Sequence, residues 1–354
     1  MTKSAEASAH SPFSLSRRTL LKGSAGLAAA GLATALLPSG VLAAGEIVAL
    51  VHTQAAGDNG PVDSMIAKLT ELAKEKGFDT KIVYAADPAT YETIFRTLGD
   101  AGASIIVSTF NEVAEPFKAL APSYPNTKWI QLFADPFEPT MPNVVTVSYD
   151  YYLGCYLSGM FGALTSKTGK LGYIGGLSLP PLNADANAIR AGAISVKPDA
   201  TLTVAFAGSF QDPAKGQEIA GQMYKAGVDF IQTDSAATDA GIIAAANEMP
   251  GKLVSGISPA QYKLGPSSVA TLVSLDFGQS LYNEVSSALK PDWKGGHTKT
   301  GLGTGVIDFV LSPEFVAKGP TDLVAKAKEI WPQIDAAKAK IHDGSLTVAF
   351  NTTL

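Results

Sequence analysis

The chain has 354 residues, is 46% hydrophobic and carries 27 basic against 32 acidic residues, a net charge of −5. The acidic balance argues against nucleic-acid and anionic-lipid partners, because both require clustered lysine and arginine. A single cysteine, Cys155, cannot close an internal disulfide, so stability has to come from the burial of apolar side chains.

The first 44 residues have the layout of a secretory signal. Two adjacent arginines, Arg17 and Arg18, precede a stretch without any charged residue, residues 23–45, which contains small residues typical of a cleavage site. The arginine pair resembles the twin-arginine export signal. We therefore predict that residues 1–44 form a signal peptide of the twin-arginine type and are removed. An ordinary Sec signal and an anchor helix are the alternatives.

The chain that remains after this cleavage is more acidic. Removal takes away four basic residues and one acidic residue and leaves 23 basic against 31 acidic residues, a net charge of −8. No cysteine follows the apolar stretch closely enough to carry a lipid. The sequence therefore predicts a periplasmic monomer without a membrane anchor. Its roughly 310 residues exceed one usual hydrophobic core and predict two lobes.

Short apolar runs alternate with helical patterns through most of the remaining chain. A helix is predicted over residues 62–76, because Met65, Ile66, Leu69 and Leu72 recur at helical spacing. The predicted strands, in chain order, are 46–53, 80–86, 104–110, 127–134 and 143–149, then 170–176, 201–208, 228–234 and 252–258. Apolar strands that alternate with helices indicate parallel sheets covered on both faces, and two such series indicate two doubly wound lobes.

The last part of the chain has a less regular pattern. Residues 268–277 predict a strand, and residues 278–289 predict a helix. Residues 300–311 predict a strand pair or a bent strand, residues 322–341 a long helix, and residues 345–350 a last strand.

Most signatures of an enzyme are missing from the sequence. The histidines His52, His297 and His342 are far apart and have no cysteine or acidic residue at metal-ligand spacing, so neither a metal nor another cofactor is expected. There is no G-x-S-x-G nucleophile motif and no G-x-x-x-x-G-K-[ST] phosphate loop. A strand-like run, not a helix, follows the stretch GLGTGV (301–306), which favours a bulge or a hinge-side loop over a dinucleotide site.

Polar residues gather where the predicted strands end. Ligands of doubly wound sheets bind outside the carboxyl ends of the strands, where helix N-termini present backbone N–H groups. Short polar side chains in these loops can cap the following helix or contact a ligand, and the sequence leaves both roles open.

Two long stretches resemble one known family. YYLGCYLSGMFGALTSKTGKLGYIGGLSLPPLNADANAIRAGA (151–193) and GSFQDPAKGQEIAGQMYKAGVDFI (208–231) look like the basic membrane protein family, also called PnrA-like. The members of this family are substrate-binding components of ABC transporters. The likeness is carried by YLSG, by SKTGK with its strand, by the proline-containing loop that follows, and by GSF-x-DP-x-KG. It extends more thinly over residues 46–311.

The resemblance implies an α/β fold of the type I periplasmic binding kind, with two doubly wound parallel-sheet lobes, three crossover segments, a ligand in the cleft between the lobes and no catalysis. The expected lobes are residues 45–150 plus 260–295 for the first, and 151–259 plus 296–354 for the second. The expected crossovers lie near Asp150–Leu153, Ser258–Tyr262 and Trp293–Lys299.

The resemblance also implies a purine ligand held by an aromatic pair and by carboxylates. Nucleoside-binding members have an aromatic residue where this chain has Pro61, and acids where it has Ser258 and Ala260, which favours a free base over a nucleoside. Phe110 and Phe137 are expected to replace the aromatic residue missing at Pro61. The expected ligand-binding residues are Asp58, Phe110, Asp135, Phe137, Asn183, Phe210, Asp234, Ser258 and Gln261.

The predicted function is that of a periplasmic receptor that closes its two lobes on a purine base or nucleoside and delivers it to an inner-membrane ABC permease. An exported enzyme that uses the same cleft and a sensor for a different small polar ligand are the alternatives.

Overall fold

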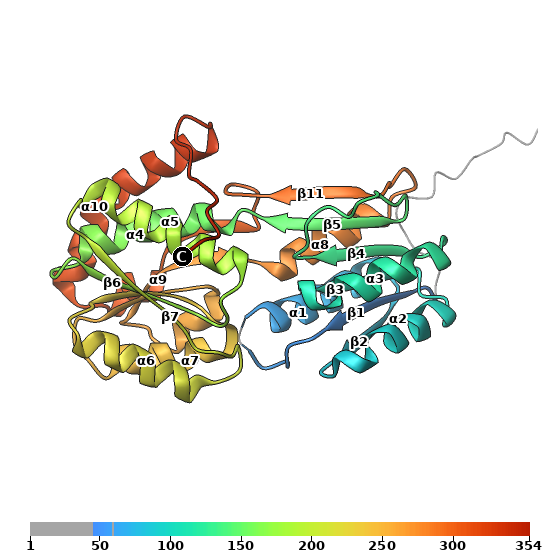
Figure 1. Ribbon diagram of the computed structural model, residues 1–354, viewed down its shortest axis with the longest axis horizontal. Helices are drawn as coiled ribbons and strands as arrows, with labels where there is room; N and C mark the ends of the chain where they lie inside the picture. Colours follow the sequence, from blue (N-terminus) through green and yellow to red (C-terminus); the bar gives the residue numbers. More distant parts are fainter. Residues whose placement is uncertain (1–44, 59) are drawn as a thin grey trace, which may run out of the picture. The chain divides into compact units, whose positions relative to one another are not determined.

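The computed structural model describes residues 45–58 and 60–354, which form two six-stranded sheets flanked by helices (Figure 1). The predicted signal peptide, residues 1–44, lies outside the described residues. The predicted α/β architecture with two mainly parallel, doubly wound sheets is confirmed.

The first sheet is parallel throughout, with the strand order β11-β5-β4-β3-β1-β2. One face packs against α1 and α8, and the other packs against α2 and α3. The strands are β1 (Ile47–His52), β2 (Asp79–Tyr84), β3 (Ile105–Thr109), β4 (Lys128–Leu132), β5 (Val144–Tyr149) and β11 (Gly296–Thr300). The helices are α1 (Pro61–Lys76), α2 (Tyr91–Asp100), α3 (Ala114–Leu120) and α8 (Phe277–Ala288). We call this sheet with its helices lobe 1.

The second sheet has the order β12-β10-β9-β8-β6-β7, and only β12 runs antiparallel to its neighbour. The strands are β6 (Lys170–Gly175), β7 (Thr201–Phe206), β8 (Phe230–Asp234), β9 (Leu253–Gly256), β10 (Val269–Leu275) and β12 (Ile307–Leu311). The helices are α4 (Tyr151–Thr165), α5 (Pro180–Val196), α6 (Pro213–Lys225), α7 (Asp239–Asn247), α9 (Pro313–Lys318) and α10 (Thr321–His342). We call this sheet with its helices lobe 2.

Short 3-10 helices join several of these elements. They are η1 (Pro88–Thr90), η2 (Asn111–Val113), η3 (Ala121–Ser123), η4 (Ala236–Thr238) and η5 (Pro259–Lys263). Two of them, η4 and η5, follow β8 and β9 and therefore lie at the carboxyl ends of the strands of the second sheet.

Local sequence explains the best-predicted elements. Helix α1 starts with Pro61, buries Met65, Leu69 and Leu72, and ends at Gly77 in the left-handed conformation. The helix predicted over residues 62–76 is therefore confirmed. In lobe 2, α4 and α5 touch through glycines. A Cβ on Gly159 would lie 2.0 Å from the Ile189 carbonyl oxygen, and one on Gly192 would lie 1.9 Å from the Tyr156 oxygen. The glycine of the YLSG motif thus serves close helix packing.

The chain passes between the two sheets at Asp150, at Asp276 and through residues 301–306. The first crossover lies where the sequence predicts it. The prediction at 258–262 is wrong because β10 is a buried apolar strand that adds to the same sheet as β9. The prediction at 293–299 is wrong because the polar strand β11, GHTKT, pairs with β5 through its backbone and has no apolar pattern to reveal it. The stretch GLGTGV is a link between the sheets, as the hinge-side interpretation requires.

The strand predicted over residues 345–350 is absent from the described fold. Val348 is buried in the core of lobe 2, which accounts for the apolar pattern, but the segment is not assigned as a strand. Further along the segment, backbone carbonyls accept hydrogen bonds from side chains of α5. The chain end lies beside α5 in Figure 1.

Candidate functional site

The carboxyl ends of the parallel strands in both sheets lead to the crossovers. β5 ends at Tyr149, immediately before Asp150, and β10 ends at Leu275, immediately before Asp276. Because parallel strands end at a common edge, the loops after β1, β3 and β4 share an edge with Tyr149, and those after β6, β8 and β9 share one with Leu275. These two carboxyl edges hold most of the predicted ligand-binding residues.

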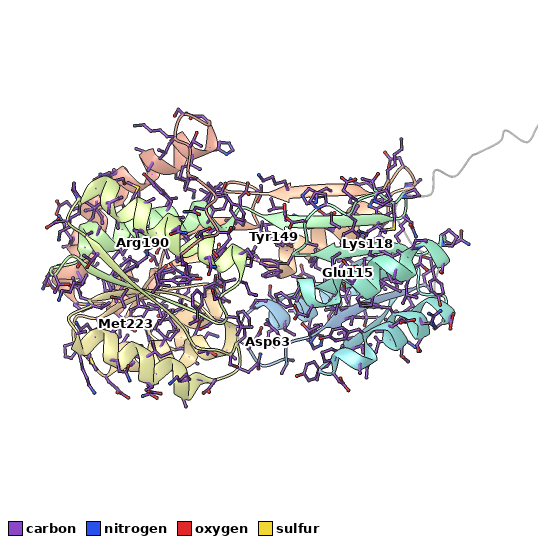
Figure 2. The ribbon with its side chains drawn as sticks, viewed as in Figure 1. Asp63, Glu115, Lys118, Tyr149, Arg190 and Met223 are labelled. Atoms are coloured by element: carbon purple, nitrogen blue, oxygen red, sulfur yellow. The ribbon has the colours of Figure 1, made fainter. Side chains whose placement is uncertain are left out.

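The carboxyl edge of lobe 1 carries a group of four aromatic rings, Phe110, Phe133, Tyr149 and Phe277, which we call the aromatic edge cluster. The Phe110 ring lies 6.1 Å from Phe133 and 5.8 Å from Phe277, centroid to centroid. The Phe133 and Tyr149 rings are stacked at 6.0 Å, and Tyr149 meets Phe277 edge-on at 5.1 Å. Phe277 is buried, and the other three residues are half-buried and pack against the core of lobe 1. Tyr149, labelled in Figure 2, lies at the end of β5.

The phenylalanines that directly follow β3 and β4 have an unusual backbone. Phe110 has a φ of 71° and Phe133 a φ of 57°, the left-handed region that costs a non-glycine residue about 1–3 kcal/mol and that gathers at functional sites. The buried side chain of Gln131 holds this geometry. Its Nε2 donates to the carbonyls of Phe110 (2.9 Å) and Leu132 (3.2 Å), and its Oε1 accepts a hydrogen bond from the Ser108 hydroxyl.

Phe210 lies at the carboxyl edge of lobe 2, directly over a glycine. A Cβ built on Gly176, the residue after β6, would lie 2.3 Å from two ring carbons of Phe210, so only glycine lets the ring rest there. The ring is half-buried. Gly176, the second glycine of the pair at the end of β6, and the aromatic residue of GSF-x-DP-x-KG, both part of the family likeness, therefore meet in space.

The loops after β8 and β9 are joined by a buried amide. Gln261 is 1% exposed; its Oε1 accepts from the Ile257 N–H at 2.8 Å and its Nε2 donates to Asp239 Oδ2 at 2.9 Å. The other oxygen of Asp239 accepts from the N–H and the hydroxyl of Ser235. Burial raises the pKa of Asp239 to about 6 against these hydrogen bonds. Gln261 was predicted to contact the ligand, and in the structure its amide holds two edge loops together.

Asp234 ends β8, is half-buried, and lies beside the buried acids Asp185 and Asp239. Burial, together with the charge of Asp239, raises the pKa of Asp234 to about 7, although hydrogen bonds to Asp185 and Tyr173 oppose the shift. The Tyr173 hydroxyl donates to Asp234 at 3.4 Å. Burial and the charge of Asp234 raise the pKa of Asp185 well above its ordinary value. Two carboxyls this close to each other, one of them buried, favour holding at least one proton at neutral pH.

Three predicted residues have internal hydrogen-bond partners. The carboxylate of Asp58 accepts from the N–H groups of Gly60, Val62 and Asp63 at 2.9–3.2 Å and so caps the start of α1. Ser258 caps η5 through the Ala260 N–H, at 3.3 Å. Asn183, on α5, accepts from the Ser178 hydroxyl and donates to the Thr352 carbonyl. The sequence left capping open as an alternative, and for Asp58 and Ser258 the structure contains the cap.

Asp135 and Phe137 are not members of the aromatic edge cluster. Asp135 is exposed in the loop after β4, and its charge acts on His297, whose ring nitrogens are hydrogen-bonded to Thr146 and Ser148. Burial nevertheless lowers the pKa of His297. Phe137 packs on the α2–α3 face of the sheet, with the ammonium of Lys118 5.6 Å from its ring centroid. Phe110 is thus the predicted aromatic residue that reaches the cluster, and Phe137 is not.

Sequence reasoning missed several residues at these edges. Phe133, Tyr149 and Phe277 were assigned to strands, although each adjoins a strand end or a crossover, which was the available signal. Asp185 lies inside an alanine-rich helix with no pattern that points to a partner, and its pairing with Asp234 depends on the packing of α5 on the sheet.

Comparison with known proteins identifies the family. A family model described as ABC transporter substrate-binding protein PnrA-like matches residues 46–340. The chain belongs to this family. Basic membrane protein A of Borreliella afzelii is 28% identical over 86% of this chain and 91% of its own length. A purine-binding protein of Brucella abortus is 26% identical over 84% of this chain and 85% of its own length.

Solved structures support the same fold. A solute-binding protein of an ABC transporter system from Aeropyrum pernix superposes with a TM-score of 0.78 at 20% identity, covering 87% of this chain and 94% of that one. One from Conexibacter woesei gives a TM-score of 0.66 at 22% identity, covering 86% and 99% of the two chains. The predicted type I periplasmic binding fold is therefore confirmed.

The family sets the general role of the protein. PnrA-like proteins are substrate-binding components of ABC transporters and not enzymes, and they act outside the cytoplasm on a small ligand and a membrane permease. In the part of the chain that the structure describes, no helix is both long and apolar enough to span a bilayer. Residues 45–58 and 60–354 also contain no group of three His, Cys, Asp or Glu side chains arranged to hold a metal ion.

Proposed function

We propose that this protein is the periplasmic receptor of an ABC importer and that it binds a purine, as the free base, between the carboxyl edges of its two lobes. The observation that carries the proposal is the pair of half-buried aromatic surfaces at these edges, the aromatic edge cluster in lobe 1 and Phe210 in lobe 2. A planar heteroaromatic ring gains affinity from stacking on such faces.

Two further observations support a purine. The relative from Brucella abortus, similar over most of both chains, is described as purine-binding. Asp135, an exposed carboxylate in the loop after β4, is available to accept a hydrogen bond from a ring N–H or an exocyclic amino group. Family positions that serve nucleoside binding are occupied by Pro61, Ser258 and Ala260, which favours the base over the nucleoside.

The identity of the ligand is tested most simply by identifying the small molecule that co-purifies with the protein. The protein, purified from the periplasm without denaturation, is analysed by native mass spectrometry and the released small molecule is identified. We expect a purine base at one copy per chain. A different compound at that stoichiometry, such as an amino acid or a sugar, would overturn the purine assignment and leave the family role intact.

Export is proposed to depend on the twin arginines. We expect the double substitution Arg17→Lys, Arg18→Lys to leave the precursor in the cytoplasm, because this signal requires both guanidinium groups. Cell fractionation measures the outcome, with Lys22→Arg as a control that keeps the charge and the arginine pair. Efficient export of the double variant would show that an ordinary Sec signal operates.

A further inference from the structure

The segment after α10 is held on lobe 2 as an extended strap, residues 348–353. The Asn187 Nδ2 atom donates to the carbonyls of Asn351 and Thr353, both at 2.8 Å. The Asn183 Nδ2 atom, one helical turn earlier on α5, donates to the carbonyl between them, that of Thr352, at 3.1 Å. Two side-chain amides thus bind three successive carbonyls of the strap.

The remaining atoms of both amides are also engaged. The Asn187 Oδ1 atom accepts from the Arg190 guanidinium at 2.7 Å, which fixes the orientation of the amide (Arg190 is labelled in Figure 2). The Asn183 Oδ1 atom accepts from the Ser178 hydroxyl at 3.1 Å. Ser178 belongs to the loop of residues 176–179 after β6, which begins with the glycine under Phe210.

The loop of residues 176–179 buries little apolar surface of its own. Leu177 and Leu179 are each 39% exposed. A loop with few buried contacts opens easily, so its position depends on polar contacts such as the one between Ser178 and Asn183.

The strap also contacts the first crossover, through Phe350. The Phe350 ring meets the Tyr152 ring edge-on at a centroid distance of 5.2 Å. Tyr152 lies two residues after Asp150, at the first crossover. The Asp150 N–H donates to the Thr300 carbonyl at 2.8 Å, and the Asp150 carboxylate lies 3.3 Å from the Lys299 ammonium. The strap therefore contacts two helices of lobe 2. One is α4, at whose start the chain enters the lobe, and the other is α5, which follows the loop of residues 176–179.

We infer that Asn183 and Asn187 are positioning residues. By binding the strap they hold the loop of residues 176–179 in a fixed place relative to the first crossover, and this loop includes Gly176, on which the Phe210 ring rests. The loop, α5 and the start of α4 then move as one body when the lobes close. The consequence for ligand affinity rests on the proposed function, whereas the consequence for loop motion does not.

The test uses the isosteric double variant Asn183→Asp, Asn187→Asp of the whole mature chain. Aspartate keeps the shape and the acceptor oxygens for Ser178 and Arg190, but it has no N–H to donate to the strap. Asn283→Asp is the matched control, because Asn283 is an exposed helical asparagine on α8 whose oxygen also accepts a hydrogen bond. Amide hydrogen exchange is measured without any ligand.

We expect the five N–H groups of residues 177–183 (Pro180 and Pro181 have none) to exchange about tenfold faster in the double variant than in the wild type and the control, while amides of β6 and β8 are unchanged. Phe350→Ala, which leaves both asparagines in place, is expected to raise exchange at 151–154 and 177–183 together. Wild-type exchange at 177–183 in both variants would overturn the inference, and so would faster exchange at the strap alone. If adenine binds, the double variant should also weaken its affinity several-fold, whereas Asn283→Asp should not.

Discussion

The two lobes share a topology but present different chemistry at their carboxyl edges. In lobe 1, strands β3 and β4 are each followed by a phenylalanine with a left-handed backbone, and the rings of these residues contact Tyr149 and Phe277. Lobe 2 ends β8 in a half-buried aspartate, ties its loops with side-chain amides, and places the Phe210 ring over Gly176. The first edge is suited to an apolar ring face, and the second to holding its own loops in place.

This difference indicates a division of work between the edges. A rigid aromatic surface supplies binding energy at little cost in conformational entropy. Under the proposed function, the hydrogen-bonded loops of lobe 2 would keep the Phe210 ring in a fixed position as the lobes close on the ligand. Substitutions at one edge, compared with matched substitutions elsewhere, test this division.

The largest effect is expected from Gln131→Leu in lobe 1. The substitution removes three hydrogen bonds and leaves the carbonyls before and after the strained residues without this donor, which should cost about 2–4 kcal/mol in the free energy of unfolding. Urea denaturation measures it.

Gln232→Leu is the comparison in lobe 2. Gln232 accepts from Ser158 and donates to the Thr233 carbonyl alone, so we expect a smaller loss of about 1–3 kcal/mol. Equal losses at the two positions would show that Gln131 does not support the left-handed phenylalanines.

The next effect concerns the seat of Phe210. Gly176→Ala places a methyl group where the ring lies and should displace it, weakening purine binding by about 1–3 kcal/mol, the scale of a lost stacking contact. Gly221→Ala is the control, since a Cβ on this helical glycine of α6 would meet nothing within 4 Å. Calorimetry with adenine measures both, and unchanged affinity in Gly176→Ala would remove Phe210 from the binding account.

The smallest effect is a dependence of stability on pH that comes from lobe 2. The pKa of Asp234 is raised to about 7 and that of Asp239 to about 6, so the folded state retains protons that the unfolded chain releases above about pH 4. The contribution of these groups to stability is therefore highest in acid and is lost as pH rises through 6 and 7.

Between pH 5 and pH 8, the free energy of unfolding of Asp234→Asn should fall by about 1–2 kcal/mol less than that of the wild type. Asp335→Asn, at an exposed position on α10, should leave it unchanged. Thermal unfolding across this pH range measures the slope. A wild-type slope in Asp234→Asn would show that the Asp234 carboxyl does not retain its proton.

The sequence predicted the architecture well because alternating apolar strands and helices carry a strong local signal. It failed at β11, whose five residues have no apolar pattern and which joins the first sheet through backbone pairing with β5. It also failed at residues 345–350, where the apolar Val348 is buried by packing and not by membership of a sheet.

The candidate site was predicted only in part, because its parts come together through packing. Phe110 and Asp234 were predicted from their positions at strand ends, and Phe210 from the family motif GSF-x-DP-x-KG. The role of Gln131 depends on two left-handed residues in different loops, and that of Asn183 on a distant segment. Neither contact leaves a trace in the spacing of residues along the chain.

The central claim is that one purine ring contacts both edges at once. Isothermal titration of adenine into the wild type, Phe110→Ala and Phe210→Ala tests it most directly. The account predicts saturable binding to the wild type and a loss of about 1–3 kcal/mol, roughly 5- to 150-fold in affinity, in each single variant. Wild-type affinity in either folded variant, or no binding of adenine, guanine or hypoxanthine to the folded wild type, would contradict it.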